Sequence, residues 1–275
     1  MFAKLEEQLK AATRTIVFTE GTDARILDAA DKLTNQGILN VILIGEEGEV
    51  KKAAADGGFH IDKCQIVNPA AYDEMEPMVE EMLRLRKGKM TEEQVRSALS
   101  QGNYFGTMLV KMGKADCLLG GATYSTADTV RPALQLIKTK PGNKIVSSTF
   151  IMVKGDEKLA FADCAINIDP SEDDLVEIAI ESAKTAKVFG IDPKVAMLSY
   201  STLGSGKGES VTKMANATAK VKEQAPDLAI DGELQFDAAV SPEVAKIKCQ
   251  GSPVAGQANT FIFPDISAAN IGYKI

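Results

Sequence analysis

Short apolar runs alternate along the first half of the chain with longer stretches in which apolar residues recur every three or four positions. The runs are predicted strands at Thr15–Phe18, Asn40–Ile44, Gln65–Val67 and Ala115–Leu119. The amphipathic stretches between them predict helices at about residues 23–36, 72–87 and 104–112. This alternation is typical of βαβ units, so we expect a parallel sheet.

The second half opens on a different pattern. A turn at residues 141–143 is followed by two apolar runs, residues 144–153 and 159–164, with a polar link at residues 154–157 between them. Two such runs joined by a short polar link predict an antiparallel hairpin.

Beyond the hairpin the helical spacing returns. Helices are predicted over residues 173–189 and 210–224, with a buried strand at Val195–Leu198 between them. We therefore expect an α/β protein with two domains, residues 1–143 and 144–275. Its sheets should be mostly parallel, with the antiparallel hairpin in the second domain.

Composition narrows the class of protein. The 275 residues are 45% hydrophobic and 25% charged, which is typical of a globular protein. The net charge of −7 argues against broad binding to nucleic acid or to an anionic membrane. The N-terminus lacks the apolar core of a secretory signal, and no apolar run approaches the ~20 residues that span a bilayer. The cysteines are isolated at positions 64, 117, 164 and 249, so we expect reduced thiols and a cytoplasmic location.

Few residues suit a metal site. His60 is the only histidine, and it lies in a Gly-Gly-Phe-His turn that predicts a surface loop. Three acids, Asp231, Glu233 and Asp237, could chelate a metal or act as bases, but their spacing fits no standard ligand pattern. Such acids more often fix loops by accepting hydrogen bonds from backbone N–H groups. No metal is therefore expected.

A loop rich in small residues, Ser199–Ser210, follows the buried strand and opens a helix. Small residues let the backbone approach a ligand closely, and a helix N-terminus offers N–H groups to an anion. The loop matches neither the phosphate loop of NTPases nor the G-x-G-x-x-G dinucleotide motif. An anion site is the favoured interpretation, and a flexible connection is the alternative.

A second loop, residues 120–132, also follows a strand. Ser125 has capping-box spacing, Thr126 and Thr129 add hydroxyls, and Arg131 lies about one turn further on. Hydroxyls, backbone N–H groups and an arginine together suit a phosphate. The alternative is a well-capped helix whose arginine is solvated.

Two other arginines lie near helix ends. Arg25 follows Asp23, a predicted N-cap, so its charge opposes the helix dipole unless an anion binds nearby. Arg86 lies between Arg84 and Lys87 at a helix C-terminus, where the residues alone favour a solvated basic cluster.

Four segments carry a resemblance to a known family. They are residues 120–132, KVAMLSYSTLGSGKGESV from Lys194, PDLAIDGELQFDAA from Pro226, and SPVAGQANTFIFPDISAANIGYKI from Ser252. The chain resembles the phosphate acetyltransferases (phosphotransacetylases) of the phosphate acetyl/butyryltransferase family over essentially its whole length. The sequence Gly232-Glu-Leu-Gln235 resembles the acetyl branch of the family more than the butyryl branch.

The resemblance implies a two-domain fold like that of isocitrate and isopropylmalate dehydrogenases, with the site in the interdomain cleft. It implies reversible acetyl transfer between coenzyme A and inorganic phosphate, through acetyl phosphate, in a homodimer without a metal. Acetyl-CoA is then a substrate rather than a tightly bound cofactor. A non-catalytic acyl-CoA-binding regulatory domain and a propionyl- or butyryl-preferring enzyme are the alternatives.

The resemblance links Arg25, Arg86 and Arg131 with coenzyme A binding or catalysis and places the Ser199–Ser210 loop in the cleft, and the hydroxyl and glycine residues join them on the chemistry given above. Arg131 is expected to be catalytic. The residues expected to bind coenzyme A lie on three helix starts or ends and on the small-residue loop. They are Arg25, Arg86, Ser125, Thr126, Thr129, Ser201, Thr202, Gly204, Ser205 and Gly206.

One departure from the family concerns the end of the sequence. Family members continue past Tyr273 by a few tens of residues that return to the first domain and carry an Asn-Asp-Leu-Ser-Arg-Gly-type motif. That motif and a following aspartate are usually given the central catalytic roles. The expectation is therefore a shortened chain, a chain whose tail is not seen, or a natural short form.

Overall fold

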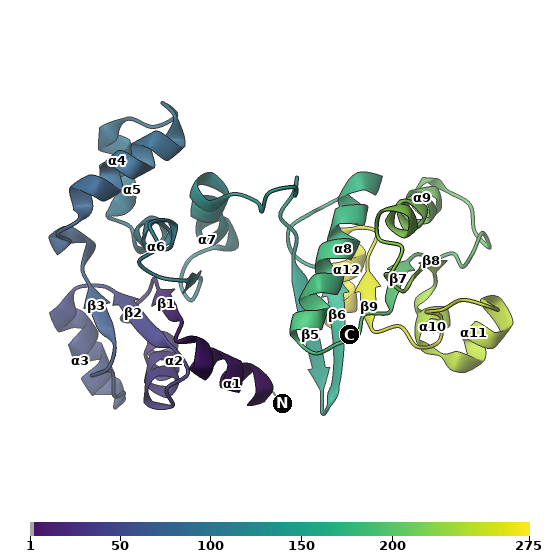
Figure 1. The fold of residues 1–275 in the computed structure, drawn as a ribbon, viewed down its shortest axis with the longest axis horizontal. Coiled ribbons are helices and arrows are strands. Elements are labelled where there is room, and N and C mark those ends of the chain that lie inside the picture. Colours follow the sequence, from purple (N-terminus) through teal and green to yellow (C-terminus); the bar gives the residue numbers. More distant parts are fainter. Residues whose placement is uncertain (1–2) are drawn as a thin grey trace. The chain divides into compact units, whose positions relative to one another are not determined.

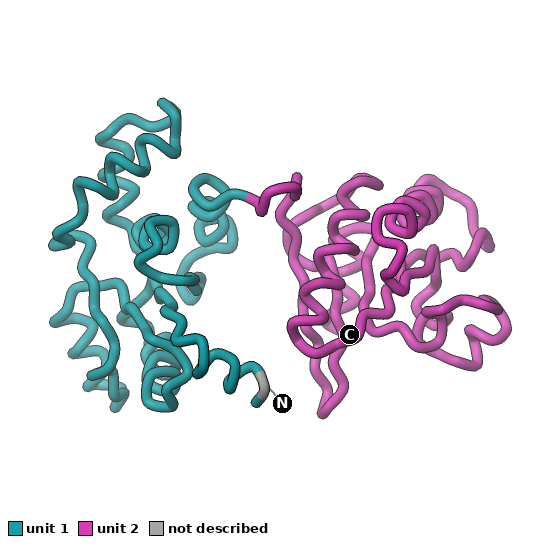
Figure 2. Tube along the Cα trace, viewed as in Figure 1, with its two compact units in different colours: residues 1–138 teal, residues 139–275 magenta. Residues whose placement is uncertain are grey.

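The computed structural model describes residues 3–275. The chain divides into two compact units, residues 1–138 and 139–275 (Figure 2). The sequence predicted a division at residue 143, within the turn that follows. Each unit is built around its own sheet, so each is described by itself.

Unit 1 contains a parallel sheet of four strands in the order β3-β2-β1-β4. Figure 1 labels the first three of these strands side by side. The strands are β1 (Thr15–Phe18), β2 (Asn40–Ile44), β3 (Gln65–Val67) and β4 (Cys117–Leu119). The register pairs Val17 with Ile42 on one side and with Leu118 on the other. The predicted parallel sheet is confirmed.

Helices cover both faces of this sheet because successive strand residues point to opposite sides. Val17 packs with residues of α4, α5 and α6, while Phe18 packs with residues of α2 and α3. The helical segments of unit 1 are α1 (Ala3–Ala12), α2 (Ala24–Asn35), α3 (Glu47–Gly57), η1 (Pro69–Ala71), α4 (Met75–Arg86), α5 (Glu92–Leu99), α6 (Gly102–Lys111), α7 (Thr126–Pro132) and η2 (Ala133–Ile137).

The local signals explain most of these bounds. Asp23 caps α2 as predicted, since its carboxylate accepts from the N–H of Arg25. The predicted helix at 72–87 begins later, at Met75, because Pro69 starts a separate 3₁₀ turn before it. Pro132 removes an N–H donor at the end of α7, and a π-helical turn follows directly.

Unit 2 contains a mixed sheet of five strands in the order β5-β6-β9-β7-β8. The strands are β5 (Thr149–Lys154), β6 (Glu157–Ala162), β7 (Val195–Leu198), β8 (Ile230–Leu234) and β9 (Thr260–Ile262). Only β5 and β6 pair in an antiparallel manner, so the predicted hairpin is confirmed. A two-residue turn joins them, and Gly155 adopts φ 61° there.

The predicted first strand of the hairpin was too long at its start. The N–H groups of Lys144 and Ile145 donate to Glu177 of α8 (Glu172–Val188). These residues are therefore held against a helix and do not join the sheet.

Both faces of the second sheet are also covered. Residues of α8 and α9 (Glu209–Gln224) pack with Val195 and Met197, and residues of the C-terminal helices pack with Ala196 and Leu198. Those helices are α10 (Phe236–Val240), α11 (Pro242–Lys248) and α12 (Ile266–Gly272). In the part of the chain that the structure describes, no helix is long and apolar enough to cross a membrane.

Candidate functional site

The first candidate site lies at the carboxyl ends of β1 and β4, which are neighbours in the parallel sheet of unit 1. Because parallel strands end at one edge, the loops that follow them meet there, and this edge is where α/β proteins bind ligands. Residues 19–23 follow β1 and residues 120–125 follow β4. The structure brings these two predicted loops together.

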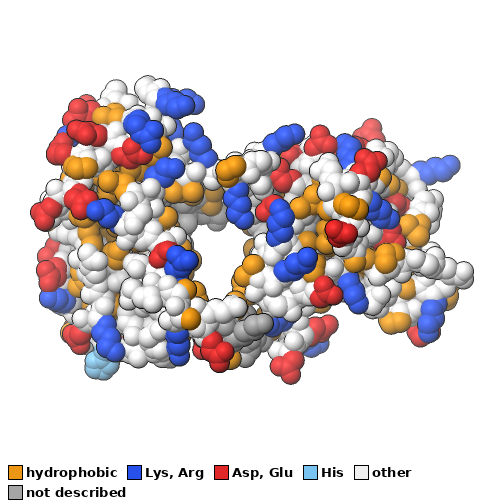
Figure 3. Space-filling model, viewed as in Figure 1, with side chains coloured by type: hydrophobic (Ala, Val, Ile, Leu, Met, Phe, Trp, Pro, Cys, Tyr) orange, Lys and Arg blue, Asp and Glu red, His pale blue; other side chains and the backbone are white. Residues whose placement is uncertain are grey.

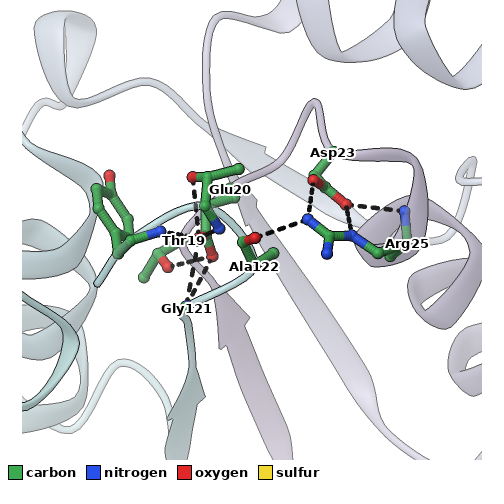
Figure 4. A network of polar contacts seen from close by, with 8 residues as sticks. Thr19, Glu20, Asp23, Arg25, Gly121 and Ala122 are labelled. Carbon is green, nitrogen blue, oxygen red and sulfur yellow. Dashed lines mark hydrogen bonds and ion pairs between the residues drawn. The ribbon is translucent and has the colours of Figure 1, made fainter. Parts of the chain in front are cut away.

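Glu20 joins the two loops. Its side chain is buried, with 8% of the residue exposed. Its carboxylate accepts from the backbone N–H groups of Thr123 at 2.7 Å, Gly121 at 3.2 Å and Tyr124 at 3.3 Å (Figure 4). The hydroxyls of Thr19 and Thr123 donate to it as well. Burial raises the pKa of this carboxyl, but the hydrogen bonds, led by that from Thr123, outweigh burial and lower it below its ordinary value.

Arg25 makes a second connection between the loops. Its guanidinium donates to both carboxylate oxygens of Asp23, at 3.0 and 2.7 Å, and to the carbonyl of Ala122 at 2.7 Å (Figure 4). The hydrogen bond from Arg25 is the main reason that the pKa of Asp23 falls to about 2. The Arg25 side chain remains 69% exposed, so it has N–H groups left for a ligand.

Helix α7 carries the other predicted residues of this site. Ser125 caps it by accepting from the N–H of Asp128 at 3.1 Å, and Thr129 donates to the carbonyl of Ser125. Arg131 donates to Asp128 at 3.1 Å, and its side chain is 55% exposed. The Ser125 and Thr129 hydroxyls therefore shape the helix start, whereas Thr126 and most of Arg131 face solvent.

Arg86 ends α4 and is only partly buried. Its Nε is buried, and it is the one buried side-chain polar atom without a hydrogen-bond partner that the described residues contain. An unpaired buried donor costs about 1–3 kcal/mol, so such atoms call for an explanation. Arg84 differs, because it is paired with Glu81 on the helix surface.

The second candidate site is the loop after β7 in unit 2. Ser201 is fully buried, and its hydroxyl donates to Glu233 of the neighbouring strand β8 at 2.8 Å. The N–H of Gly204 donates to the same carboxylate at 2.7 Å, and the N–H of Gly206 donates to the Ser201 hydroxyl. The predicted residues are thus brought together, but these N–H groups are engaged within the protein.

The remaining residues of this loop are bonded in the same manner. Thr202 and Gln235 exchange two hydrogen bonds through the Thr202 hydroxyl, at 3.0 and 3.1 Å. The Ser205 hydroxyl accepts from the Thr202 N–H at 2.9 Å. Tyr200 donates to the carbonyl of Lys207. The loop is therefore a bonded structure and differs from a flexible connection.

Of the three acids predicted to support loops, Glu233 does so, because it accepts from the N–H of Gly204 in the small-residue loop. Asp231 is buried and paired with Lys222 at 2.9 Å, and Asp237 is paired with Lys248 at 3.2 Å, so these two acids bind helix lysines instead. Within residues 3–275 no group of three or more histidine, cysteine or acidic side chains is arranged to hold a metal ion.

Sequence reasoning missed two buried acids. Glu20 was passed over, although an acid two residues after a strand and directly before a glycine is a usable signal. Asp163 follows β6 and is 3% exposed. It accepts from the N–H groups of Ala165, Ile166 and Asn167 at 2.9–3.2 Å. Because the partners of Glu20 lie about a hundred residues away, only the fold reveals them.

Other surface features are less informative. Acidic and basic side chains are mixed over the visible face of each unit, and the single histidine is exposed (Figure 3). An apolar hollow of about 660 Å³ opens on unit 2, lined by residues that include Met152, Phe236 and Tyr273. All four cysteines are free: Cys117 on β4 is exposed, Cys64 is half-buried, and Cys164 and Cys249 are buried.

Comparison with known proteins gives a consistent result. The profile of one protein family, described as phosphate acetyl/butaryl transferase, matches residues 1–275. A phosphate acetyltransferase of Bacillus subtilis is 52% identical over 275 residues, which cover 100% of this chain and 85% of the relative. One from Staphylococcus aureus is 48% identical over 98% of this chain and 84% of its own length.

Solved structures agree with these relatives. A phosphotransacetylase from Streptococcus pyogenes has a TM-score of 0.96 and 51% identity, covering 100% of this chain and 84% of its own. A branched-chain phosphotransacylase from Enterococcus faecalis has a TM-score of 0.66 at 20% identity, covering 95% and 83%, which shows a shared fold alone.

Proposed function

The chain belongs to the phosphate acetyl/butaryl transferase family, and from this premise we propose which residues take part in moving an acetyl group between coenzyme A and inorganic phosphate. The activity is supported by the match to proteins named phosphate acetyltransferase or phosphotransacetylase, which share about 50% sequence identity with this chain over 98–100% of its length. In this reaction acetyl-CoA and phosphate interconvert with acetyl phosphate and coenzyme A.

The chemistry sets what the site must supply. Starting from acetyl phosphate, the coenzyme A thiol loses its proton, and the thiolate sulfur attacks the acetyl carbonyl carbon. The C–S bond forms, the C–O bond to phosphate breaks, and phosphate leaves with the electron pair and takes up the proton that the thiol released. Both substrates are anionic, so fixed cations and N–H donors stabilise the developing charge and hold the partners in line.

In unit 1 we assign the phosphate-facing role to Arg131. Its guanidinium is half exposed and its contact with Asp128 at 3.1 Å leaves most of its donors free. Arg25 and Arg86 bind the phosphates of coenzyme A, together with Ser125, Thr126 and Thr129 at the start of α7. The buried, unpaired Nε of Arg86 supports this assignment, because a bound anion would supply its missing partner.

In unit 2 we assign coenzyme A binding to the small-residue loop. Its members Ser201, Thr202, Gly204, Ser205 and Gly206 form a bonded, close-packed turn. Their engaged N–H groups favour contact through the loop surface, where Gly204 and Ser205 are exposed. The preferred acyl group is acetyl, as the names of the relatives suggest.

The direct test measures acetyl phosphate formation from acetyl-CoA and phosphate. The expected result is turnover that falls by about a hundredfold in Arg131→Gln, since one such donor contributes ~10²–10³ to catalysis. Arg84→Gln, an exposed arginine paired with Glu81, is the control and should keep full activity. Binding of coenzyme A with no transfer would instead indicate a regulatory acyl-CoA-binding domain.

Acyl preference and assembly need separate measurements. Competing acetyl-, propionyl- and butyryl-CoA against one another should favour acetyl-CoA. We further propose a homodimer, for which light scattering should give about twice the chain mass of 29.3 kDa. A mass of one chain at micromolar concentration would reject the dimer and leave the activity untouched.

A further inference from the structure

We propose that Glu20 is a positioning residue of the unit 1 site: its buried carboxylate accepts hydrogen bonds from the backbone N–H groups of Gly121, Thr123 and Tyr124, and thereby fixes the start of α7, which carries Arg131. This inference rests on the proposed function, since it states how the same site is held ready for an anionic substrate. Glu20 itself touches no substrate in this proposal.

The N–H groups of the loop after β4 donate to an acceptor within the protein, the carboxylate of Glu20. Three backbone N–H groups and two hydroxyls converge on Glu20, whose carboxylate provides about four acceptor positions. Hydrogen bonds to an ionised group are stronger than neutral ones. The carboxylate therefore occupies the N–H groups that would otherwise attract an external anion.

The loop also packs closely against Thr19 and α6, so a change in its hydrogen bonds is transmitted to its neighbours. A Cβ added to Gly120 would lie 2.5 Å from the Thr19 hydroxyl, and one added to Gly102 of α6 would lie 2.6 Å from the Thr19 carbonyl. Asn103 of α6 donates to the carbonyl of Asp128 at 2.8 Å, which holds the first turn of α7. Thr19 is thus closely packed against Gly120 and Gly102, and α6 also contacts the first turn of α7.

Two arginines at this edge keep donors that can bind a ligand. With the N–H groups of Gly121, Thr123 and Tyr124 engaged, the exposed guanidiniums of Arg25 and Arg131 are the charged donors at this edge. Arg25 is tied to the same loop through the Ala122 carbonyl. Loss of the Glu20 contacts would therefore displace both cations relative to the ligand, although neither touches Glu20 through a hydrogen bond.

The test compares Glu20→Gln with Glu46→Gln. Gln has the shape of Glu but replaces one acceptor oxygen by an NH₂ donor. Glu46 is a matched control, because it follows β2 at the same edge and accepts from a helix N–H, that of Glu49 at 2.8 Å, yet holds no candidate ligand residue. A milder variant, Thr123→Val, removes one hydroxyl donor and keeps the backbone contact.

Three quantities are measured: coenzyme A affinity by calorimetry, kcat and KM for acetyl transfer, and amide hydrogen exchange at residues 121–124. In Glu20→Gln we expect faster exchange there and coenzyme A binding weakened by about tenfold or more, as expected when charged groups shift by a fraction of an ångström. Thr123→Val should show a smaller change of the same kind. Glu20→Asp, which keeps the charge, should recover part of the affinity.

The outcomes separate the inference from the function on which it rests. Faster exchange in Glu20→Gln with unchanged affinity, kcat and KM makes Glu20 merely structural and overturns the proposal. An equal loss of affinity in Glu46→Gln also overturns it, because the effect would then be general to this edge. Absence of coenzyme A binding by the unaltered protein rejects the proposed function itself.

Discussion

At the scale of single residues, buried carboxylates shape the loops of both units. Glu20 in unit 1 and Glu233 in unit 2 each accept N–H and hydroxyl donors from a loop that belongs to a neighbouring strand. Such charge-assisted bonds contribute more than neutral ones when solvent is excluded. The loops therefore keep one shape even though they are rich in small residues.

The Asp23–Arg25 pair gives a prediction about pH. Because the pKa of Asp23 falls from an ordinary 3.8 to about 2 in the folded protein, its stabilising contribution is complete above pH 4 and is lost as the pH falls through about 2. An NMR titration of the carboxyl should show a midpoint near 2. In Arg25→Gln the midpoint should return toward 3.8, whereas an unchanged midpoint would assign the shift to another cause.

Glu233 gives a prediction about stability. Glu233→Gln keeps the acceptor oxygen used by Ser201 and Gly204 but removes its charge, so the free energy of unfolding should fall by about 1–2 kcal/mol. Urea unfolding measures this. The control Glu243→Gln changes an exposed acid of the same unit and should stay within about 0.5 kcal/mol. Equal effects for the two variants would contradict the role given to Glu233.

At this scale, the sequence predicted contacts between residues that are close in the sequence and missed contacts between residues that are far apart. Ser125 and Asp23 act on neighbours within a few residues, so their caps could be predicted directly. Glu20 acts on a segment about a hundred residues away, and its partners offer only backbone N–H groups, which every residue has. No pattern in the sequence could have paired them.

At the scale of elements, close approach depends on glycine. Gly102 begins α6 and lies against the Thr19 carbonyl, while Gly106 lies among the side chains of Leu118, Ile44 and Thr19. Helix α6 can therefore pack directly on the carboxyl ends of β1 and β4. This contact supports the same loops that Glu20 and Arg25 connect.

Replacing Gly102 tests that contact. Gly102→Ala places a Cβ 2.6 Å from the Thr19 carbonyl, a backbone atom that must shift, so stability should fall by about 1–3 kcal/mol. Gly48→Ala in α3 is the matched control, because its nearest neighbour is the flexible end of Glu46, 3.1 Å away. Thermal unfolding should show a lower Tm only for Gly102→Ala. An equal Tm for both variants would show that α6 has room to move.

The positions of helices and strands were predicted correctly where the apolar spacing extends over many residues. The prediction was wrong where a tertiary contact sets the end of an element. The hairpin and the helices α2, α6, α8 and α9 matched the apolar spacing within a few residues. The strand predicted from residue 144 instead starts at Thr149, because Glu177 accepts the N–H groups of Lys144 and Ile145. That competition between a helix side chain and a sheet edge is invisible to a local pattern.

At the scale of the whole molecule, each unit has its own sheet and its own buried clusters on both faces. The parallel sheet of unit 1 and the mixed sheet of unit 2 were both predicted, because strand spacing distinguishes crossover connections from hairpins. The segment between the units is exposed and polar, and it ends where Glu177 holds Lys144.

In limited proteolysis, trypsin should cleave the chain first in this segment. Lys138 is exposed and precedes Thr139, whereas Lys140 precedes a proline that blocks trypsin. The first trypsin products should be residues 1–138 and 139–275, identified by intact mass. Lys138→Gln should remove this cut and leave both units folded. An earlier cut within either sheet would contradict the division into two units.

The one exposed cysteine has a practical consequence. Cys117 lies on β4, three residues before Gly120, and is exposed, although partial burial, with a smaller effect of Asp116, also raises the pKa of its thiol. Burial, with a smaller effect of Asp163, raises the pKa of Cys164 to about 12, which makes that thiol less reactive. A maleimide dye should therefore attach at Cys117 ahead of the other three cysteines. The natural chain thus offers a fluorescent reporter beside the Gly120–Ser125 loop, without any introduced residue.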